Sequence, residues 1–297
     1  MIKEKLASVF DFVGVIDVTR YPNYQKEALL AGFKSIFVVG LAYPNLTYPH
    51  QSDAFLASMY TYGLDYHDVI RRLAQEVLKG EDYQVLVDNH QLNERKALEL
   101  TGLAYWAKND LMISKQFGSY FFIGLVLTPK RYPEVIVEND DSCGDCQLCI
   151  EACPVNALRG GFKIAQCLSA LNQKKGPLSE LTIKKNYLLL GCDICQRVCP
   201  KNRGIVNDWH HHFKKRETTY VLIADLFNLS NKQFNLKYGK HAYLWKGKTL
   251  LLRNALTLLL KTKNTNYNEQ IKKTIADQKY PKWYKEDALK ILKRLES

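Results

Sequence analysis

Long apolar runs are missing from this 297-residue sequence. No stretch approaches the roughly 20 consecutive apolar residues that a helix needs to cross a membrane, so we expect no membrane association. The N-terminal run is interrupted by Asp11 and lacks the small-residue cleavage site of a secretory signal. The Walker A loop and the G-x-G-x-x-G pattern, which bind nucleotide phosphates, are also absent. These absences predict a cytoplasmic protein without a nucleotide-phosphate loop.

Acidic residues are scarce in the last third of the chain. Residues 201–297 hold 21 Lys and Arg against 8 Asp and Glu, a net charge of +13, whereas residues 1–200 hold 21 against 22. Such asymmetry is typical of a polyanion-binding appendage on a nearly neutral body. A solvated, lysine-rich helical surface would have the same composition. Charge alone leaves both interpretations open.

Eight cysteines are concentrated in the middle of the chain. The cytosol keeps thiols reduced, so these cysteines are better interpreted as metal ligands than as disulfides. Residues 143–154 read C-x2-C-x2-C-x3-C-P, the spacing of bacterial ferredoxins, in which the fourth cysteine ligates the other cluster. A second set consists of one cysteine followed by C-x2-C-x3-C-P at residues 192–200.

This spacing predicts two [4Fe-4S] clusters. Cluster one is assigned to Cys143, Cys146, Cys149 and Cys199, and cluster two to Cys153, Cys167, Cys192 and Cys195. The alternative is a pair of structural zinc sites with four thiolates each, but zinc ribbons need neither the third closely spaced cysteine nor the following proline. Two such clusters move single electrons, and the module leaves long flanks on both sides for a partner site.

The N-terminal flank alternates strand and helix patterns. Buried strands are predicted at 35–44, 83–88 and 119–128, and helices at 65–79 and 92–102, the second ending at Gly102. This alternation indicates an α/β layer. After Cys199, the segments 247–263, 268–279 and 284–296 predict helices joined by short turns, as in an α-solenoid. Trp245, beside basic residues, either stacks on a base or packs in the core.

Several motifs in fixed order resemble a known family. They are YGLDYH (62–67), VLVD ending at Asp88, AKN (107–109), GSYFF (118–122), the two cysteine runs, CLSAL (167–171), KKGP (174–177) and KGKTLLLRNAL (246–256). Together they resemble epoxyqueuosine reductases over most of the chain. The doubled cysteine motif alone is shared by many electron carriers, whereas its combination with YGLDYH and Asp88 is much more specific.

The resemblance implies a cobalamin-dependent oxidoreductase of α+β or α/β class, related to reductive dehalogenases. A cobalamin-binding α/β domain at 1–138 would precede a two-cluster ferredoxin-like domain at 139–204. A basic HEAT-like helical region at 205–297 would bind tRNA. The implied reaction removes the epoxide oxygen of epoxyqueuosine at the tRNA wobble position, with electrons passing from the clusters to cobalamin.

The resemblance also implies roles for individual residues. Asp88 would be the proton donor, for which we expect a raised pKa, although an aspartate before a helix can instead be its N-cap. The expected cobalamin contacts are Ser58, Asp88, Met112, Ile123, Ser169, Asp193 and Ile194. Lys175 would contact tRNA, and Lys246, Lys248 and Arg253 are further candidates for phosphate contacts. We expect Asp65 and His67 to start a helix rather than to ligate cobalt.

Three alternatives remain at this stage. They are a cobalamin-dependent enzyme like the reductive dehalogenases, a ferredoxin-type electron carrier without cobalamin, and a tRNA-binding module with structural clusters. An epoxyqueuosine reductase would also need an electron donor, such as a flavodoxin or ferredoxin. We expect a monomer.

Overall fold

The computed structural model describes residues 2–139 and 141–297. They form two compact units, each assembled from separate chain segments. The first unit comprises Met1–Asn45, Leu64–Gln147 and Cys199–Lys214, and the second comprises Leu46–Gly63, Leu148–Val198 and Lys215–Ser297. The division into domains at 1–138, 139–204 and 205–297 stays a prediction.

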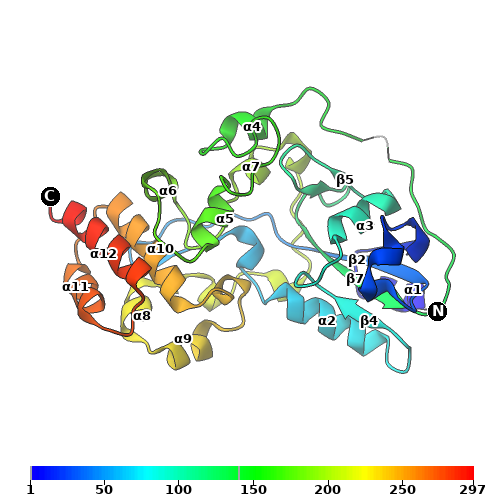
Figure 1. The fold of residues 1–297 in the computed structure, drawn as a ribbon, viewed down its shortest axis with the longest axis horizontal. Helices are drawn as coiled ribbons and strands as arrows, with labels where there is room; N and C mark the ends of the chain where they lie inside the picture. Colours follow the sequence, from blue (N-terminus) through cyan, green and yellow to red (C-terminus); the bar gives the residue numbers. More distant parts are fainter. Residues whose placement is uncertain (1, 140) are drawn as a thin grey trace. The chain divides into compact units, whose positions relative to one another are not determined.

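The first unit is built on a four-stranded sheet (Figure 1). The strands, in their order across the sheet, are β1 (Phe12–Asp17), β2 (Ser35–Ala42), β7 (Phe121–Thr128) and β4 (Gln84–Leu86). Every neighbouring pair is antiparallel, with Val38 opposite Leu125 in the central pair. The three predicted strands are therefore confirmed as β2, β4 and β7.

A helix packs on each face of this sheet because β2 and β7 are apolar on both faces. On one face, α3 (Glu94–Thr101) buries Leu98 in a cluster with Val38 and Leu125. On the other face, α2 (Tyr66–Val77) places Ile70 against Gly124 of β7, where a Cβ atom would lie only 2.9 Å from the isoleucine methyl group. Glycine at this position lets the helix approach the strand closely.

Both helices begin at side-chain caps. Asp65 precedes α2 and accepts a hydrogen bond from the backbone N–H of His67, while Asn93 precedes α3 and accepts one from Lys96. Gly102 ends α3 in the left-handed conformation, with φ of 72°. The predicted helices at 65–79 and 92–102 are thus confirmed, and so is the helix-start role of Asp65.

The second unit is mainly helical. Its C-terminal part consists of α8 (Ile223–Asn228), α9 (Asn231–Tyr238), α10 (Lys248–Lys261), α11 (Asn268–Ala276) and α12 (Lys282–Leu295). The last three, orange to red in Figure 1, correspond to the three predicted helices, and α12 packs against both α10 and α11. Two short strands, β3 (Ala54–Phe55) and β8 (Val221–Leu222), pair antiparallel in the same unit.

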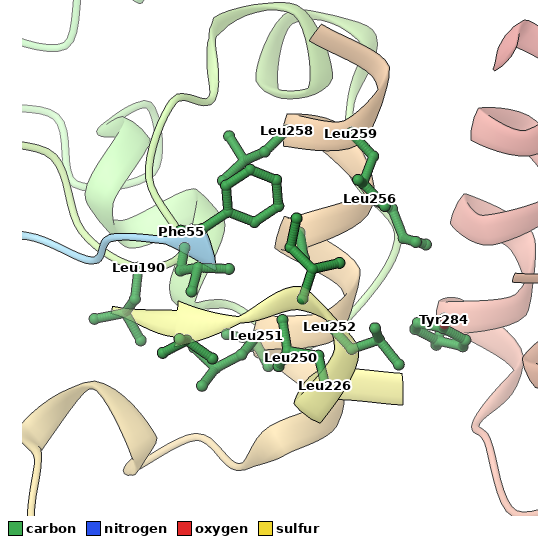
Figure 2. Packing of buried hydrophobic residues seen from close by; sticks show 14 of the residues in the cluster. Phe55, Leu190, Leu226, Leu250, Leu251, Leu252, Leu256, Leu258, Leu259 and Tyr284 are labelled. Carbon is green, nitrogen blue, oxygen red and sulfur yellow. The ribbon is translucent and has the colours of Figure 1, made fainter. Parts of the chain in front are cut away.

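The core of the second unit surrounds α10. Most of its leucines, including Leu251 and Leu256, are buried, and α10 is buried on almost every side. Figure 2 shows these side chains together with Phe55 from β3 and Tyr284 from α12. A helix that is apolar nearly all round must lie inside the unit. The chain segments before and after the cysteine runs therefore share one core.

The remaining elements are short. They are α1 (Ile2–Ala7), β5 (Tyr105–Trp106), β6 (Met112–Ile113), α4 (Leu148–Ala152), α5 (Leu168–Gln173), α6 (Glu180–Lys185) and α7 (Ile194–Arg197). Single 3-10 turns lie at Val18–Arg20, Tyr24–Lys26, Ala28–Leu30, Met59–Thr61, Pro200–Asn202, His211–Phe213, Glu217–Thr219 and Ala242–Leu244. Within the described ranges, every helix is too short or too polar to span a bilayer.

Candidate functional site

Asp88 lies in a cluster of polar and aromatic side chains in the first unit. The hydroxyl of Tyr66 donates a hydrogen bond to its carboxylate, and Nε2 of His67 lies 3.0 Å from the same oxygen, Oδ2. The Tyr66 ring is stacked between His67 and Phe122, with centroid separations of 4.1 and 4.2 Å. The Asp88 side chain is still 48% exposed. Its carboxylate is thus held in place and remains accessible.

The loop that carries Asp88 is tied to the start of α3. Oε1 of Glu94 accepts the backbone N–H of Asp88 at 3.0 Å and lies 3.0 Å from Nε2 of His90. Asp88 itself has a left-handed backbone, with φ of 49°, which non-glycine residues seldom adopt. The cap of α3 is Asn93, so the alternative role of Asp88 as an N-cap is wrong.

The charges in this cluster differ from the sequence-based expectation. Burial acts to raise the pKa of Asp88, but hydrogen bonds from His67 and Tyr66 outweigh it, and the pKa is lowered. The partners of Asp88 within the chain therefore oppose the raised pKa that a proton donor would need, and a raised pKa beside bound cobalamin stays a prediction. His67 shows the opposite balance: burial acts to lower its pKa, yet contacts with Asp65 and Asp88 raise it to about 9. At neutral pH the pair is an aspartate beside a histidinium, and His67 holds the proton.

His67 has a carboxylate at each ring nitrogen. Nδ1 lies 2.6 Å from Oδ1 of Asp65, and Nε2 contacts Asp88. Neither nitrogen is left to ligate a metal while both contacts persist. The expectation that this histidine does not bind cobalt agrees with its position.

Three of the cysteines assigned to cluster one, Cys143, Cys146 and Cys199, belong to the first unit. The backbone N–H of Lys108 points at Sγ of Cys143 over 3.5 Å, and its ammonium donates to the carbonyls of Gly144 and Cys146 at 2.6 and 3.2 Å. The AKN motif therefore supports the cysteine loop directly. Cys149 belongs to the second unit, and its place in cluster one stays a prediction.

All four cysteines assigned to cluster two lie in the second unit. Burial raises the pKa of Cys192 to about 11 and, together with the neighbouring Cys192 and Cys167, also raises that of Cys195. The Tyr187 hydroxyl lies 3.6 Å from Sγ of Cys192, and the Ala157 N–H lies 3.3 Å from Sγ of Cys153. Neighbouring, half-buried thiols with donors aimed at sulfur fit an iron–sulfur cluster, which binds them as thiolates.

An unsatisfied hydroxyl marks the cluster-one loop as well. The buried hydroxyl of Tyr105 meets no hydrogen-bond partner among the residues that the structure describes, and burial and the nearby Cys143 raise its pKa. All eight cysteines are free of disulfides. Across residues 2–139 and 141–297, no three His, Cys, Asp or Glu side chains are arranged to hold a single ion. The iron–sulfur interpretation thus depends on the spacing and on these sulfur-facing groups.

Two of the expected cobalamin contacts are brought together in the second unit. The hydroxyl of Ser58 donates to the carboxylate of Asp193, whose other oxygen accepts the Met59 N–H at 3.1 Å. Gly191 has φ of 84°, and a Cβ atom there would lie 2.5 Å from that of Ser58. Asp193 is buried, and burial raises its pKa. The residues on both sides of Cys192 therefore contact Ser58.

The other expected cobalamin contacts are divided between the two units. Met112 is buried, whereas Ile123 is the one partly exposed position in β7. In the second unit, the Ser169 hydroxyl accepts from Gln173 at 3.0 Å, and Ile194 begins α7 with its side chain partly exposed. A partly exposed isoleucine in an otherwise buried strand fits contact with an apolar ligand face.

The predicted tRNA contacts divide into two groups. Lys175 is exposed, and the ammonium of Lys246 lies 3.6 Å from the centroid of the Trp245 ring. In contrast, Lys248 is 8% exposed and donates to the Leu229 carbonyl, and burial lowers its pKa to about 8. Arg253 is 0% exposed. Their burial contradicts the predicted phosphate contacts of Lys248 and Arg253. The sequence did not predict this burial, because it depends on carbonyl partners from distant parts of the chain.

The fold and these sites define the class of the protein. Residues 142–202 match the model of the 4Fe-4S double cluster binding domain. A mixed α/β unit that presents a histidine–aspartate pair, joined to such a module, characterises an iron–sulfur oxidoreductase.

The particular family follows from two further matches. Residues 24–89, which contain Tyr66, His67 and Asp88, match the model described as "Epoxyqueuosine reductase QueG, DUF1730". The chain is 34% identical over 279 residues to the epoxyqueuosine reductase of Bacillus subtilis, covering 86% of this chain and 71% of that protein. The chain belongs to the epoxyqueuosine reductase family.

Solved structures show the same fold. An epoxyqueuosine reductase structure from Bacillus subtilis, with its catalytic aspartate loop swung out of the active site, has a TM-score of 0.79 and 25% identity, covering 99% of this chain and 97% of that chain. An epoxyqueuosine reductase with an epoxyqueuosine-modified tRNA-Tyr stem loop has a TM-score of 0.81 and 24% identity, covering 100% and 98%. The predicted mixed α/β fold with a helical C-terminal region is confirmed.

Proposed function

We propose that this chain reduces epoxyqueuosine to queuosine at the wobble position of tRNA. The observation that carries the proposal is the Tyr66–His67–Asp88 cluster, which lies within the residues matched by the family model. The family relationship favours this reaction over reductive dehalogenation and over simple electron transfer. Among the expected partners, tRNA is supported by the stem loop in the related structure. The electron donor would be a flavodoxin or ferredoxin, and the protein a cytoplasmic monomer.

Two [4Fe-4S] clusters would be held by the eight cysteines, and cobalamin by a further set of residues. Ser58, Met112, Ile123, Ser169, Asp193 and Ile194 are the proposed cobalamin contacts. When bound, these groups supply the two electrons that break the carbon–oxygen bonds of the epoxide. The chain itself would position the substrate and supply protons.

Asp88 and His67 would supply the protons in sequence. Loss of the epoxide oxygen as water consumes two electrons and two protons, so one proton must follow another. The accessible Asp88 carboxylate would face the substrate, and His67, in contact with it, carries a proton at neutral pH. A proton that passes from His67 to Asp88 and on to the leaving oxygen leaves the histidine neutral. Solvent then returns a proton to the histidine for the second transfer.

The direct test is anaerobic reconstitution of the protein with iron, sulfide and cobalamin. Epoxyqueuosine-containing tRNA, from cells that lack this protein, is then treated with the reconstituted enzyme and a chemical reductant. We expect queuosine in digested tRNA and an absorption spectrum with both cofactors. Purified protein that holds zinc, or that takes up no cobalamin, would refute the proposal.

A further inference from the structure

Trp245 is an unusually exposed aromatic residue. Its side chain is 57% exposed, although the preceding Tyr243 and Leu244 are buried in the core of the second unit. The ring is nevertheless held in place, because its Nε1–H donates to Oε1 of Gln173 at 3.0 Å. The Lys246 ammonium covers part of the ring at 3.6 Å from the centroid. An oriented, exposed indole beside a cation is not explained by packing.

The buried Arg253 fixes the segment that holds this ring. Its Nη1 donates to the carbonyls of Lys174 and Gly176, both at 2.7 Å, and its Nη2 donates to the carbonyl of Asn172 at 2.8 Å. A planar guanidinium with several fixed donors can bind three carbonyls at once, which an ammonium cannot do in the same geometry. Burial lowers the pKa of Arg253 to about 10, so it still carries its charge at neutral pH.

The segment 172–176, whose carbonyls bind Arg253, carries two exposed lysines. Lys174 and Lys175 extend from the same stretch of chain whose carbonyls bind Arg253, and Gln173 of that stretch binds Trp245. Just beyond the stretch, Asp287 accepts the N–H of Leu178 at 3.1 and 3.0 Å from its two oxygens. The indole and the lysines are therefore parts of one rigid surface.

We propose that Trp245, Lys246, Lys174 and Lys175 form an RNA-binding surface on which an unpaired base of the substrate RNA stacks against the indole. The lysines meet the flanking phosphates, and Arg253 is the positioning residue beneath them. The proposal rests on the proposed function and adds a defined contact for the substrate. It also replaces the predicted phosphate contact of Arg253 with an internal role.

The chemistry selects single-stranded RNA over other polyanions. A base in a loop has a free π-face for an aromatic ring, whereas bases in a duplex are stacked on each other. Lysines next to the ring add salt-dependent phosphate contacts without sequence preference. A membrane surface or an acidic protein would use the lysines but would gain nothing specific from the exposed indole.

The test measures binding of a tRNA anticodon stem loop and of a fully paired duplex of equal length, each at several salt concentrations. The holoenzyme is compared with Trp245→Leu, Trp245→Phe and the double variant Lys174→Ala/Lys175→Ala. We expect Trp245→Leu to weaken stem-loop binding by roughly tenfold or more, because stacking contributes that much per base. Its salt dependence and duplex binding should not change, and Trp245→Phe should restore most of the affinity.

The lysine variant should behave differently. Removing Lys174 and Lys175 should weaken binding of both RNAs and lower the slope of log Kd against log salt by about one to two units. Arg253→Met should reproduce both defects together, whereas iron content and the melting temperature identify a chain that failed to fold. Lys261→Ala, which removes an exposed cation at the other end of α10, is a matched control and should leave binding unchanged.

Two outcomes would overturn the proposal. One is unchanged stem-loop affinity in Trp245→Leu, and the other is equal loss of stem-loop and duplex binding in that variant, which would indicate a general polyanion surface. The same experiment distinguishes these outcomes from failure of the proposed reaction. A holoenzyme that binds the stem loop through Trp245 but leaves epoxyqueuosine unchanged would retain the RNA surface and refute only the reaction.

Discussion

At the scale of single residues, the pairing of Asp88 with His67 decides where the proton is stored. Both groups are partly buried, and burial alone would neutralise both. Their mutual contact has the opposite effect, since it lowers the pKa of Asp88 and raises that of His67 to about 9. The family resemblance suggested Asp88 as the acid, a role that stays a prediction. It did not predict that the neighbouring histidine carries the proton, because that depends on a 3.0 Å contact across the loop.

This pairing predicts the alkaline limit of turnover. In the wild-type holoenzyme, kcat should fall as the pH rises through about 9, because His67 loses its proton there. His67→Gln should retain both cofactors, have a lower kcat at neutral pH, and no longer show that limit. Single-turnover rates measured across the pH range provide the check. If the fall in kcat above pH 9 persists in His67→Gln, the loss of a proton from another group causes it.

The same shift has a consequence for stability. Because the folded-state pKa of His67 lies above the unfolded value of about 6.5, its protonated form stabilises the folded chain. This contribution is complete below about pH 6.5 and is lost as the pH rises through about 9. His67→Gln should therefore narrow the stability difference between pH 6 and pH 10 in chemical unfolding, relative to wild type. Equal pH dependence in both proteins would contradict the assigned shift.

A substitution of Asp88 tests the other member of the pair. Asp88→Asn keeps the size of the side chain but cannot pass on a proton, so turnover should fall by at least about a hundredfold. Iron and cobalamin content should stay at wild-type levels. Asp82→Asn, which lies shortly before β4 and outside the cluster, is a control that should leave turnover unchanged. Retained turnover in Asp88→Asn would eliminate it as the acid.

At the scale of elements, the helices and strands with strong periodicity were predictable from sequence. The strand at 35–44, the helix at 65–79 and the apolar helix at 247–263 all appear within a few residues of their expected bounds. The two-residue strands β3 and β8 were not predictable, because their pairing joins segments over 160 residues apart. The burial of Arg253 was missed for a similar reason: its carbonyl partners lie on a distant loop.

The loop after β4 provides an element-scale prediction. Glu94, the first residue of α3, accepts from the Asp88 N–H and is held by His90. Glu94→Ala should release the loop and lower kcat by roughly tenfold without loss of cofactors. Glu94→Gln keeps an acceptor oxygen at the same place and should lose much less. Equal kcat values for the two variants would show that the hydrogen bond to the loop is unimportant.

The contact between α2 and the sheet gives a second prediction at the scale of elements. Gly124→Ala should destabilise the fold by about 1–3 kcal/mol, because its methyl group would press on Ile70. Combining it with Ile70→Ala removes the clash, so the loss in the double variant should be smaller than the sum of the two single losses. Urea unfolding of the holoproteins measures all three. Strict additivity would contradict the close approach.

At the scale of the whole molecule, the cysteines connect remote parts of the sequence. Cys143 and Cys199 share the first unit although 56 residues separate them, and Cys153 and Cys195 share the second. Metal binding to such ligands stabilises the folded chain relative to the unfolded one. Anaerobic removal of iron by a chelator should therefore lower the melting temperature of the protein. Cys192→Ser should remove one cluster and reduce the iron content from about eight to about four atoms per chain. A melting temperature that does not depend on iron content would show that the clusters do not stabilise the fold.

The pairing of β3 with β8 constrains how the chain folds during its synthesis. Phe55 leaves the ribosome long before Val221 and the leucines of α10, which later surround it. The growing chain must therefore keep an apolar strand unpaired while most of the protein is translated, and such exposed edges attract chaperones or other chains. Truncation anywhere before α10 should thus yield aggregates rather than an independently folded N-terminal fragment.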